Sequence, residues 1–191
     1  MPRWKPDAQG RLERAALELF TCHGVDETMV ADIADRAGVT TCTFYNHFRD
    51  KAEVVFRGHA ELCRVIEDAV RGAAPDEPPF AVLAIALRAG AARHEADAEA
   101  IRVRHALITG HPALRERELL KRAGVGDALV SGLRARGLDD RTATLLGAVG
   151  LAVFTVAYDE WIDAPASGDC SFGDLVDDAL SLLDSTDRRL Q

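Results

Sequence analysis

The sequence predicts an all-α fold. Along almost the whole chain, apolar residues recur every three or four positions, as on one face of a helix, and no stretch alternates with the period of two that a strand requires. Glycine and proline interrupt this pattern where helices would end. Hydrophobic residues make up 48% and charged residues 28% of the 191 positions, a balance typical of globular proteins. We expect about nine helices in all.

The first three predicted helices are short and closely spaced. The first ends at Gly24, and Thr28 is the expected N-cap of the second, which ends at Gly38. Thr40 is a good N-cap for the third, where Val39 and Phe44 occupy the two positions of a hydrophobic staple. The inward positions are Leu12, Ala15, Ala16, Leu19, Phe20 and His23, then Val30, Ile33, Ala34 and Ala37, and finally Phe44 and Phe48.

A long fourth helix is expected next. Asp50 followed by Glu53 fits a capping box, and the helical pattern then continues to about Gly72. The stretch AAPDEPP at 73–79 is a break and the only obvious linker. We therefore expect a first domain over residues 1–55 and a second over 56–191. Further helices are placed near 80–95, 97–109, 112–135, 139–162 and 172–187.

Residues 28–48 have the length and spacing of a helix-turn-helix, whose second helix lies in the major groove of DNA. With the two phenylalanines inward, the third helix turns a polar face outward, and no acidic residue occurs between positions 39 and 49. Hydroxyl and amide groups can donate to phosphates or bases. An incidental short helix with a polar face is the other interpretation. The outward residues are Thr41, Cys42, Tyr45 and Asn46, with Thr40, Thr43 and His47 along the edges.

Lys51 supports the same interpretation. It falls in the first turn of the expected fourth helix, where the helix dipole disfavours a cation. A nearby anion would explain that placement, and a DNA phosphate held by Lys51 and by the free N–H groups of the helix start would be one. The alternative is a lysine that is simply solvated.

The net charge of −8 does not exclude a DNA partner. Residues 1–57 hold 8 Lys and Arg against 9 Asp and Glu, whereas residues 58–191 hold 15 against 22. The acidity therefore lies mostly in the second part, which leaves room for a local DNA-binding surface in the first.

The run from Ala15 to Val55 resembles the DNA-binding domain of TetR-family transcriptional regulators. The shared pieces are Phe20 to Gly24, then Thr28 with Val30, Ile33 and Ala34, then Ala37 to Thr40, Tyr45 to Phe48, and Lys51. The resemblance implies phosphate contacts by Thr28, Thr40, Tyr45, His47 and Lys51, and base contacts by Thr41, Cys42, Thr43 and Asn46. Three positions depart from the family pattern: Ala31 replaces a common arginine, Cys42 a small residue, and Arg49 a frequent proline.

The cysteines favour a reducing, cytoplasmic setting. The four are scattered, with no Cys-x-x-Cys pair and no metal-ligand spacing, so we expect no metal and no cofactor. Cys42 also permits a second interpretation, a redox sensor within the DNA groove, because a helix N-terminus lowers the pKa of a thiol. A tolerated small side chain is the simpler one.

The last two predicted helices suit a homodimer. The uncharged run 142–158 offers Gly147, Gly150 and other small residues for close helix approach, and residues 172–187 form a second apolar stripe. A membrane span would need about 20 predominantly apolar residues, so we expect a buried helix instead. The family resemblance implies a four-helix bundle across a two-fold axis, through helices near 139–162 and 172–187, and a palindromic operator. Closure of the monomer's own core is the alternative.

Arg104 and His105 fall on an otherwise apolar stripe. A buried cation needs a partner, which would be either an anionic ligand or an internal carboxylate. This part of the chain also resembles the ligand domains of mycofactocin-type TetR regulators that respond to acyl-coenzyme A, which implies a hydrophobic or acyl-type effector.

Taken together, these patterns predict a dimeric, sequence-specific DNA-binding transcriptional regulator, a repressor released by a small ligand. We expect no enzymatic activity, because the sequence holds no nucleophile elbow, phosphate loop or metal-ligand cluster. Two other classes stay open: a small helical enzyme, and a protein-interaction adaptor that does not bind DNA.

Overall fold

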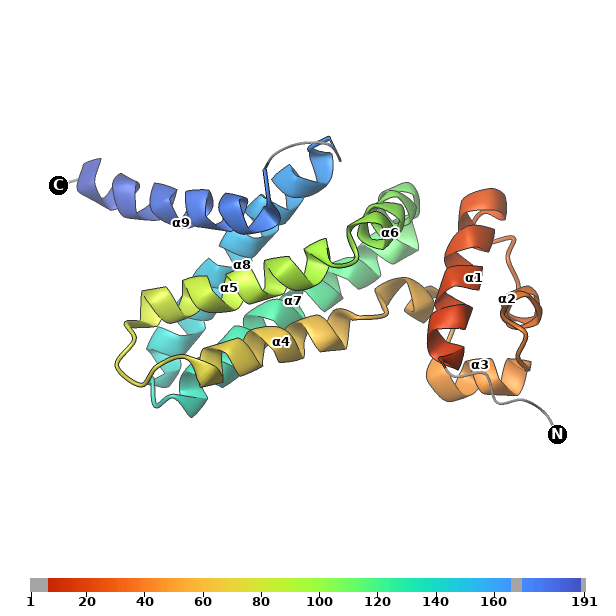
Figure 1. The fold of residues 1–191 in the computed structure, drawn as a ribbon, viewed down its shortest axis with the longest axis horizontal. Coiled ribbons are helices and arrows are strands. Elements are labelled where there is room, and N and C mark those ends of the chain that lie inside the picture. The colour runs from red at the N-terminus through yellow and green to blue at the C-terminus, as the bar shows by residue number, and fades with distance from the viewer. Residues whose placement is uncertain (1–6, 166–169, 190–191) are drawn as a thin grey trace. The chain divides into compact units, whose positions relative to one another are not determined.

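The computed structural model describes residues 7–165 and 170–189. Within these ranges the chain forms nine α-helices, one 3₁₀-helix and no strand, which confirms the all-α prediction (Figure 1). The elements are α1 (Ala8–His23), α2 (Val30–Ala37), α3 (Thr41–His47), the 3₁₀-helix η1 (Ala52–Phe56), α4 (His59–Gly72), α5 (Pro79–Glu95), α6 (Ala98–Gly110), α7 (Pro112–Ala135), α8 (Asp140–Asp163) and α9 (Phe172–Arg189).

The helices form two compact units, and both are discontinuous in sequence. The N-terminal unit contains the chain up to Gly58 together with Glu99–Glu118, which we call the α6–α7 corner. The C-terminal unit contains His59–Ala98 and the chain from Leu119 onward. The predicted domain boundary at residue 55 lies close to Gly58, where the chain first passes from one unit to the other. The sequence division placed residues 99–118 in the second domain, whereas this compact unit includes them.

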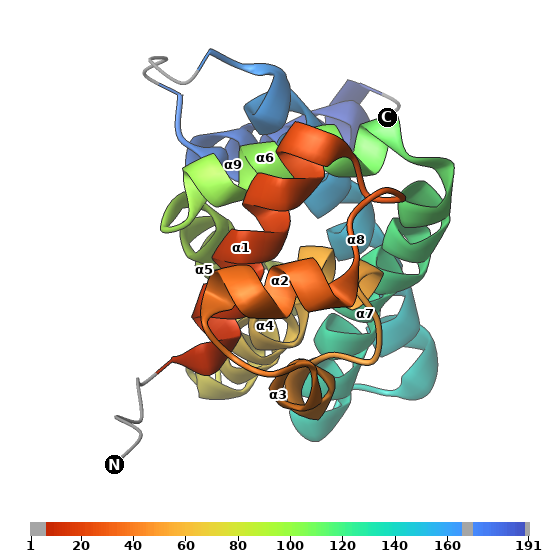
Figure 2. The ribbon, with the colours of Figure 1, turned by 90° about the vertical axis from the view of Figure 1, so that its right-hand side faces the viewer.

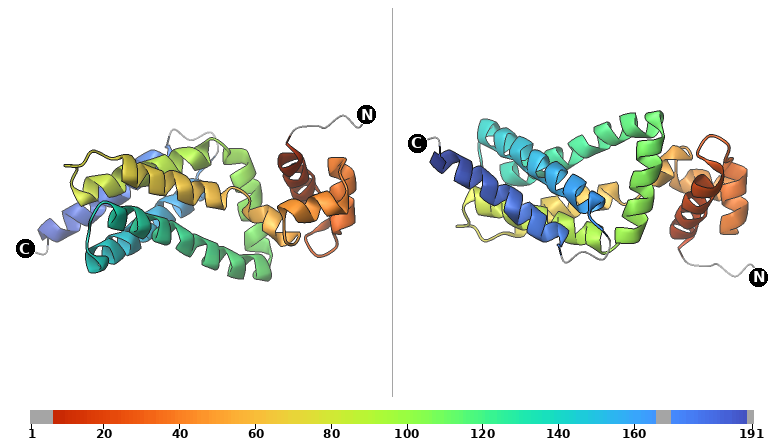
Figure 3. Two further views of the ribbon diagram at one scale, coloured as in Figure 1. Left: turned by 90° about the horizontal axis from the view of Figure 1, so that it is seen from below. Right: turned by 90° about the horizontal axis from the view of Figure 1, so that it is seen from above.

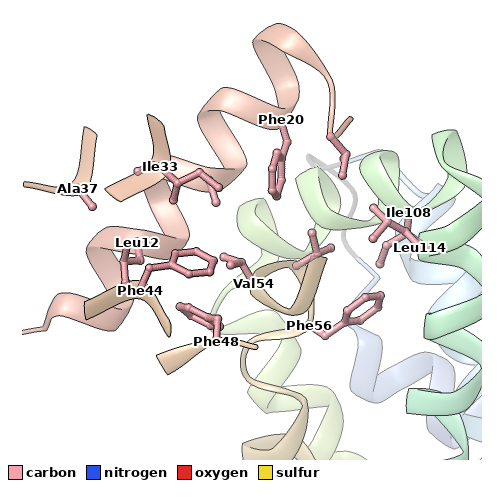
Figure 4. Packing of buried hydrophobic residues seen from close by; sticks show 14 residues of the cluster. Leu12, Phe20, Ile33, Ala37, Phe44, Phe48, Val54, Phe56, Ile108 and Leu114 are labelled. Atoms are coloured by element: carbon pink, nitrogen blue, oxygen red, sulfur yellow. The ribbon is translucent and has the colours of Figure 1, made fainter. Parts of the chain in front are cut away.

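The N-terminal unit is built on three short helices around one apolar core. Helix α1 packs against α2 and α3, and a short turn joins α2 to α3 (Figure 2). Two residues of the α6–α7 corner, Ile108 and Leu114, complete this core (Figure 4). The other labelled members are Leu12, Phe20, Ile33, Ala37, Phe44, Phe48, Val54 and Phe56.

Local signals located the first three helices, with one error. Gly24 and Gly38 follow α1 and α2 with φ of 87° and 65°, left-handed values that suit glycine, and Thr40 caps α3 through a 3.1 Å bond from the Thr43 N–H. The prediction that Thr28 caps α2 is wrong. Met29 holds that position, and its N–H donates to Asp32.

The expected fourth helix is broken in the structure. Asp50 does accept the Glu53 N–H at 2.8 Å, as the capping box requires, but a five-residue 3₁₀-helix follows instead of an α-helix. Its consecutive residues Val54, Val55 and Phe56 are all buried, and three successive side chains cannot share one face of an α-helix. Gly58, with φ of 90°, then separates η1 from α4.

The C-terminal unit joins helices that are far apart in sequence. Helix α5 contacts α4, α8 and α9, and α9 lies along α8 (Figure 3). An aromatic cluster forms here around Phe172, whose ring centroid lies 5.0 Å from that of Phe154 and 5.2 Å from that of Trp161. Glycines permit close approach, because a Cβ at Gly150 would lie 2.6 Å from side-chain atoms of Leu83 and Leu129.

Among the described helices, α8 is the one that is long and apolar enough to cross a membrane, by length and composition alone. One face of it packs within the C-terminal unit through residues such as Gly147, Val153 and Ala157. The sequence predicted a helix that is buried, whereas this chain by itself buries only one face of α8, and Leu145 and Val156 are exposed.

Candidate nucleic-acid interface

Helix α3 presents a polar surface on an apolar base. Phe44 and Phe48 are buried in the core, as the periodicity predicts. The Tyr45 side chain is 59% exposed, and its ring lies edge-on to that of Phe44 with a centroid distance of 5.4 Å. The core therefore fixes the orientation of a face that solvent reaches. The exposed residues are Thr40, Thr41, Cys42, Tyr45, Asn46 and His47, and Thr43 is half-buried.

The first turn of α3 is stabilised by two threonines. The hydroxyls of Thr40 and Thr43 lie 3.0 Å apart, and the Thr40 hydroxyl also accepts the Thr43 N–H. Both side chains are thereby held at the beginning of the helix. A hydroxyl can take part in several hydrogen bonds, so this pair can still meet a phosphate or a base edge.

Thr28, for which the family resemblance implies a phosphate contact, is buried in the structure. Its side chain is 2% exposed, and its hydroxyl donates to the Gly24 carbonyl at 2.8 Å. This hydroxyl closes the loop between α1 and α2, and its burial gives no support to a phosphate contact.

Lys51 has partners that the sequence did not indicate. Its Nζ donates to the carbonyl oxygens of Asp26 and Thr28, each at 2.9 Å. A nearby anion is therefore not needed to explain the position of this lysine, because two backbone carbonyls of the α1–α2 loop accept from it. A lysine ammonium has three donors, however, and these bonds account for two of them.

Two arginines and one histidine of the α6–α7 corner contact three carboxylates in the first stretch of the N-terminal unit. Arg104 and Arg57 both bond to Glu13, which is 5% exposed. His111 Nε2 lies 3.1 Å from the Asp26 carboxylate. Sequence analysis missed these contacts, because no local pattern relates residues so far apart.

The third carboxylate, Asp50, is held at both oxygens. Arg117 donates to Oδ1 at 2.8 Å and to Oδ2 at 3.0 Å, and the second carboxylate near this guanidinium, Glu53, lies 3.8 Å away. The hydrogen bond from Arg117 is the main reason that the pKa of Asp50 lies below its usual value. The pair is therefore ionised at neutral pH.

The two predicted ligand-binding residues lie in the N-terminal unit. Of the two partners considered for Arg104, the internal carboxylate is the one that the structure shows, since Glu13 receives its guanidinium. His105 is half-buried beside it on α6. That either residue binds a ligand stays a prediction.

Family comparisons agree with this geometry. Residues 13–57 match the family of bacterial regulatory proteins of the tetR type, and residues 77–187, more than half of the chain, match the MftR C-terminal domain. The chain belongs to the TetR family. It is a DNA-binding transcriptional regulator. No curated protein matches the chain significantly.

Solved TetR-family structures share the fold. A putative TetR-family regulator from Mesorhizobium loti has 21% identity and a TM-score of 0.60, over 93% of this chain and 94% of that one. FadR from Thermus thermophilus, solved with lauroyl-CoA, has 22% identity and a TM-score of 0.57 over 92% of each chain. FadR from Bacillus subtilis, solved with stearoyl-CoA, has 18% identity and a TM-score of 0.56 over 91% and 96%.

Proposed function

We propose that this TetR-family regulator is a cytoplasmic repressor that binds a palindromic operator as a homodimer and is released by a hydrophobic, acyl-type ligand. It acts by binding and not by catalysis. The observation that carries the proposal is the exposed, acid-free polar face of α3, which the buried Phe44 and Phe48 hold in place.

In this proposal α3 is the recognition helix, and some of its residues contact bases while others contact the DNA backbone. Thr41, Cys42, Thr43 and Asn46 read base edges, because their short polar side chains lie in the first turns of a helix that enters the major groove. Thr40, Tyr45 and His47 meet the phosphates. The third N–H donor of Lys51 also contacts a phosphate, at the edge of the α1–α2 loop.

The dimer uses the faces of α8 and α9 that the monomer leaves open. Leu145 and Val156 are 64% and 51% exposed, and Ala148 and Ala152 lie between them at helical spacing. Leu182 on α9 is 65% exposed. Isolated apolar side chains are common on surfaces, but a continuous stripe on two adjacent helices is typical of an interface.

The ligand class rests on relatives. The MftR-type C-terminal domain match covers residues 77–187, and two FadR proteins of the same fold were solved with acyl-CoA thioesters. Release requires that the ligand bind more tightly to a conformation whose recognition helices do not fit the operator.

Selection from a random duplex library, followed by fluorescence anisotropy, tests DNA recognition. We expect Asn46→Ala to relax one base position at a cost of about 1–3 kcal/mol, whereas Tyr45→Ala should weaken binding to all sequences. Lys51→Ala should lower the salt slope by about one. Leu120→Ala, on an exposed side chain of α7, is the control. Equal loss on every duplex for Asn46→Ala would contradict base reading.

Sedimentation of a matched pair tests the dimer. Val156→Glu places a charge in the proposed interface, and Leu120→Glu places the same charge on an apolar side chain of the C-terminal unit that is 76% exposed. We expect only the first to yield monomers. Two dimers, or two monomers, would count against this interface.

Three related probes test the ligand class on the assembled operator complex. Lauroyl-CoA should release the duplex, while free coenzyme A and laurate added separately should not. Release by laurate alone would assign recognition to the acyl chain, and release by coenzyme A alone would contradict an acyl-type ligand.

A further inference from the structure

Side chains of the α6–α7 corner contact the first stretch of the N-terminal unit at three separate elements. The α6–α7 corner reaches Glu13 in α1, Asp26 in the α1–α2 loop and Asp50 directly after α3. The third contact matters most for DNA, because Asp50 lies three residues after the last residue of the recognition helix.

The chain is held on both sides of this point. On one side, both Asp50 oxygens accept from Arg117, and Oδ1 also accepts the Glu53 N–H. On the other, the next residue, Lys51, donates to two carbonyls of the α1–α2 loop. Arg117 therefore restrains residues 48–50, the short segment that follows the last residue of α3.

A bidentate arginine fixes orientation as well as distance. The guanidinium is planar and presents two parallel N–H groups, so it holds a carboxylate in one plane, which a lysine ammonium cannot do. The Arg117 side chain is about one-third exposed and Asp50 about one-half, so the pair is accessible to salt and yet geometrically well formed.

We infer that Arg117 is a positioning residue for DNA binding: it holds Asp50, and through Asp50 the C-terminal end of the recognition helix, without contacting DNA itself. The inference rests on the proposed DNA-binding site on α3. It adds to that site a residue of α7, which lies 67 positions from its partner and outside the helix-turn-helix.

The test uses the full-length protein and a duplex that the wild type selects from a random library. Binding of that duplex by the wild type reports on the proposed function, and the ratio of variant to wild-type affinity reports on Arg117. The variants are Arg117→Gln, Arg117→Lys, Asp50→Asn and the double substitution Arg117→Gln with Asp50→Asn. Asparagine at 50 keeps an oxygen that can accept the Glu53 N–H.

We expect each single variant to lose roughly tenfold in affinity, which is the usual size of a charge-assisted hydrogen bond. The double variant should lose no more than either single one, since both remove the same interaction. Its net charge equals that of the wild type. A return of the double variant to wild-type affinity would show that charge alone matters, and would overturn the inference.

The salt dependence separates positioning from direct contact. Because Arg117 meets no phosphate in this proposal, the slope of log affinity against log salt should be the same in Arg117→Gln and wild type. A slope lower by about 0.9 would mean that Arg117 neutralises a phosphate itself, which would also overturn it.

A matched control and a structural measurement complete the experiment. Arg134→Gln removes another arginine of α7, whose partner Asp140 is 86% exposed. This variant should bind DNA as the wild type does. In Arg117→Gln, amide hydrogen exchange should quicken at Phe48 and Glu53 but not in α1. Unchanged exchange at these two amides, or wild-type affinity, would refute the positioning role.

Discussion

The two units of this protein join distant segments with a different balance of ion pairs and apolar packing. In the N-terminal unit, the α6–α7 corner meets the first stretch of the chain through Ile108 and Leu114 and through carboxylates that arginine and histidine side chains bind. In the C-terminal unit, α9 meets α5 and α8 around the ring of Phe172.

This difference indicates which conditions each unit responds to. Ion pairs weaken with salt and with protonation of their carboxylates, whereas packed rings respond to changes in volume. The unit that binds DNA is thus the one with ion pairs on a buried carboxylate, Glu13, whereas the Arg88–Asp177 pair of the C-terminal unit is exposed on both sides. We expect the C-terminal unit to tolerate salt and to resist substitutions that change only charge.

The largest expected effect lies in the aromatic cluster. Phe172 is fully buried, so Phe172→Ala should destabilise the protein by about 3–5 kcal/mol through lost burial and the cavity that remains. Urea unfolding measures this loss, and added salt should not change it. Leu120→Ala, on an exposed side chain of α7, is the control. A loss below about 1 kcal/mol for Phe172→Ala would show that the cluster can collapse around the gap.

The buried carboxylate of α1 should give the next largest effect. Glu13→Ala leaves the guanidinium of Arg104, which is 11% exposed, without its carboxylate, at a cost of about 3 kcal/mol. Urea unfolding at low and high salt measures it. If Glu13→Ala is as stable as the wild type, the ionic description of the N-terminal unit is wrong.

A pH effect should come from the C-terminal unit. Burial is the main reason that the pKa of His94 falls to about 4, among the rings of Phe154, Tyr158 and Phe172. Below pH 6.5 the unfolded chain binds a proton that the folded protein does not, so stability falls as the pH drops toward 4. Between pH 7.5 and pH 5 the loss should be about 2 kcal/mol.

The control for this pH effect is His94→Gln, which removes the titrating group. Its stability should change less over the same pH range, as measured by urea unfolding at each pH. Parallel curves for the variant and the wild type would assign the pH dependence to other groups.

The smallest effect is expected for a surface pair on the same helix as Glu13. Glu18 lies 2.6 Å from Arg36, with both side chains more than half exposed. Glu18→Ala should therefore cost at most about 1 kcal/mol and should do so only at low salt. A cost equal to that of Glu13→Ala would remove the distinction between buried and exposed pairs.

Sequence patterns predicted what is decided locally. Gly24, Gly38 and Thr40 end or begin helices by their own backbone and side-chain chemistry, and each was found where expected. The outward face of α3 followed from the inward assignment of Phe44 and Phe48. These features depend on neighbours within a few positions.

Contacts between distant segments left no such signal. Lys51 was interpreted by the helix that would follow it, yet its partners are carbonyls 23 and 25 positions earlier. The pattern of Asp50 and Glu53 indicated a cap but not the arginine 67 positions later. The break at Gly58 was missed because it depends on the tertiary core, in which the consecutive side chains of Val54, Val55 and Phe56 are all buried.

The division of the N-terminal unit into two stretches has a consequence for biosynthesis. When the ribosome has made residue 58, the core around Phe56 still lacks Ile108 and Leu114, which are translated only after the first stretch of the other unit. The nascent helix-turn-helix therefore cannot complete its core until the α6–α7 corner has emerged. A fragment that ends at Gly58 would present the same unfinished core to solvent, so no single cut of the chain yields this unit whole.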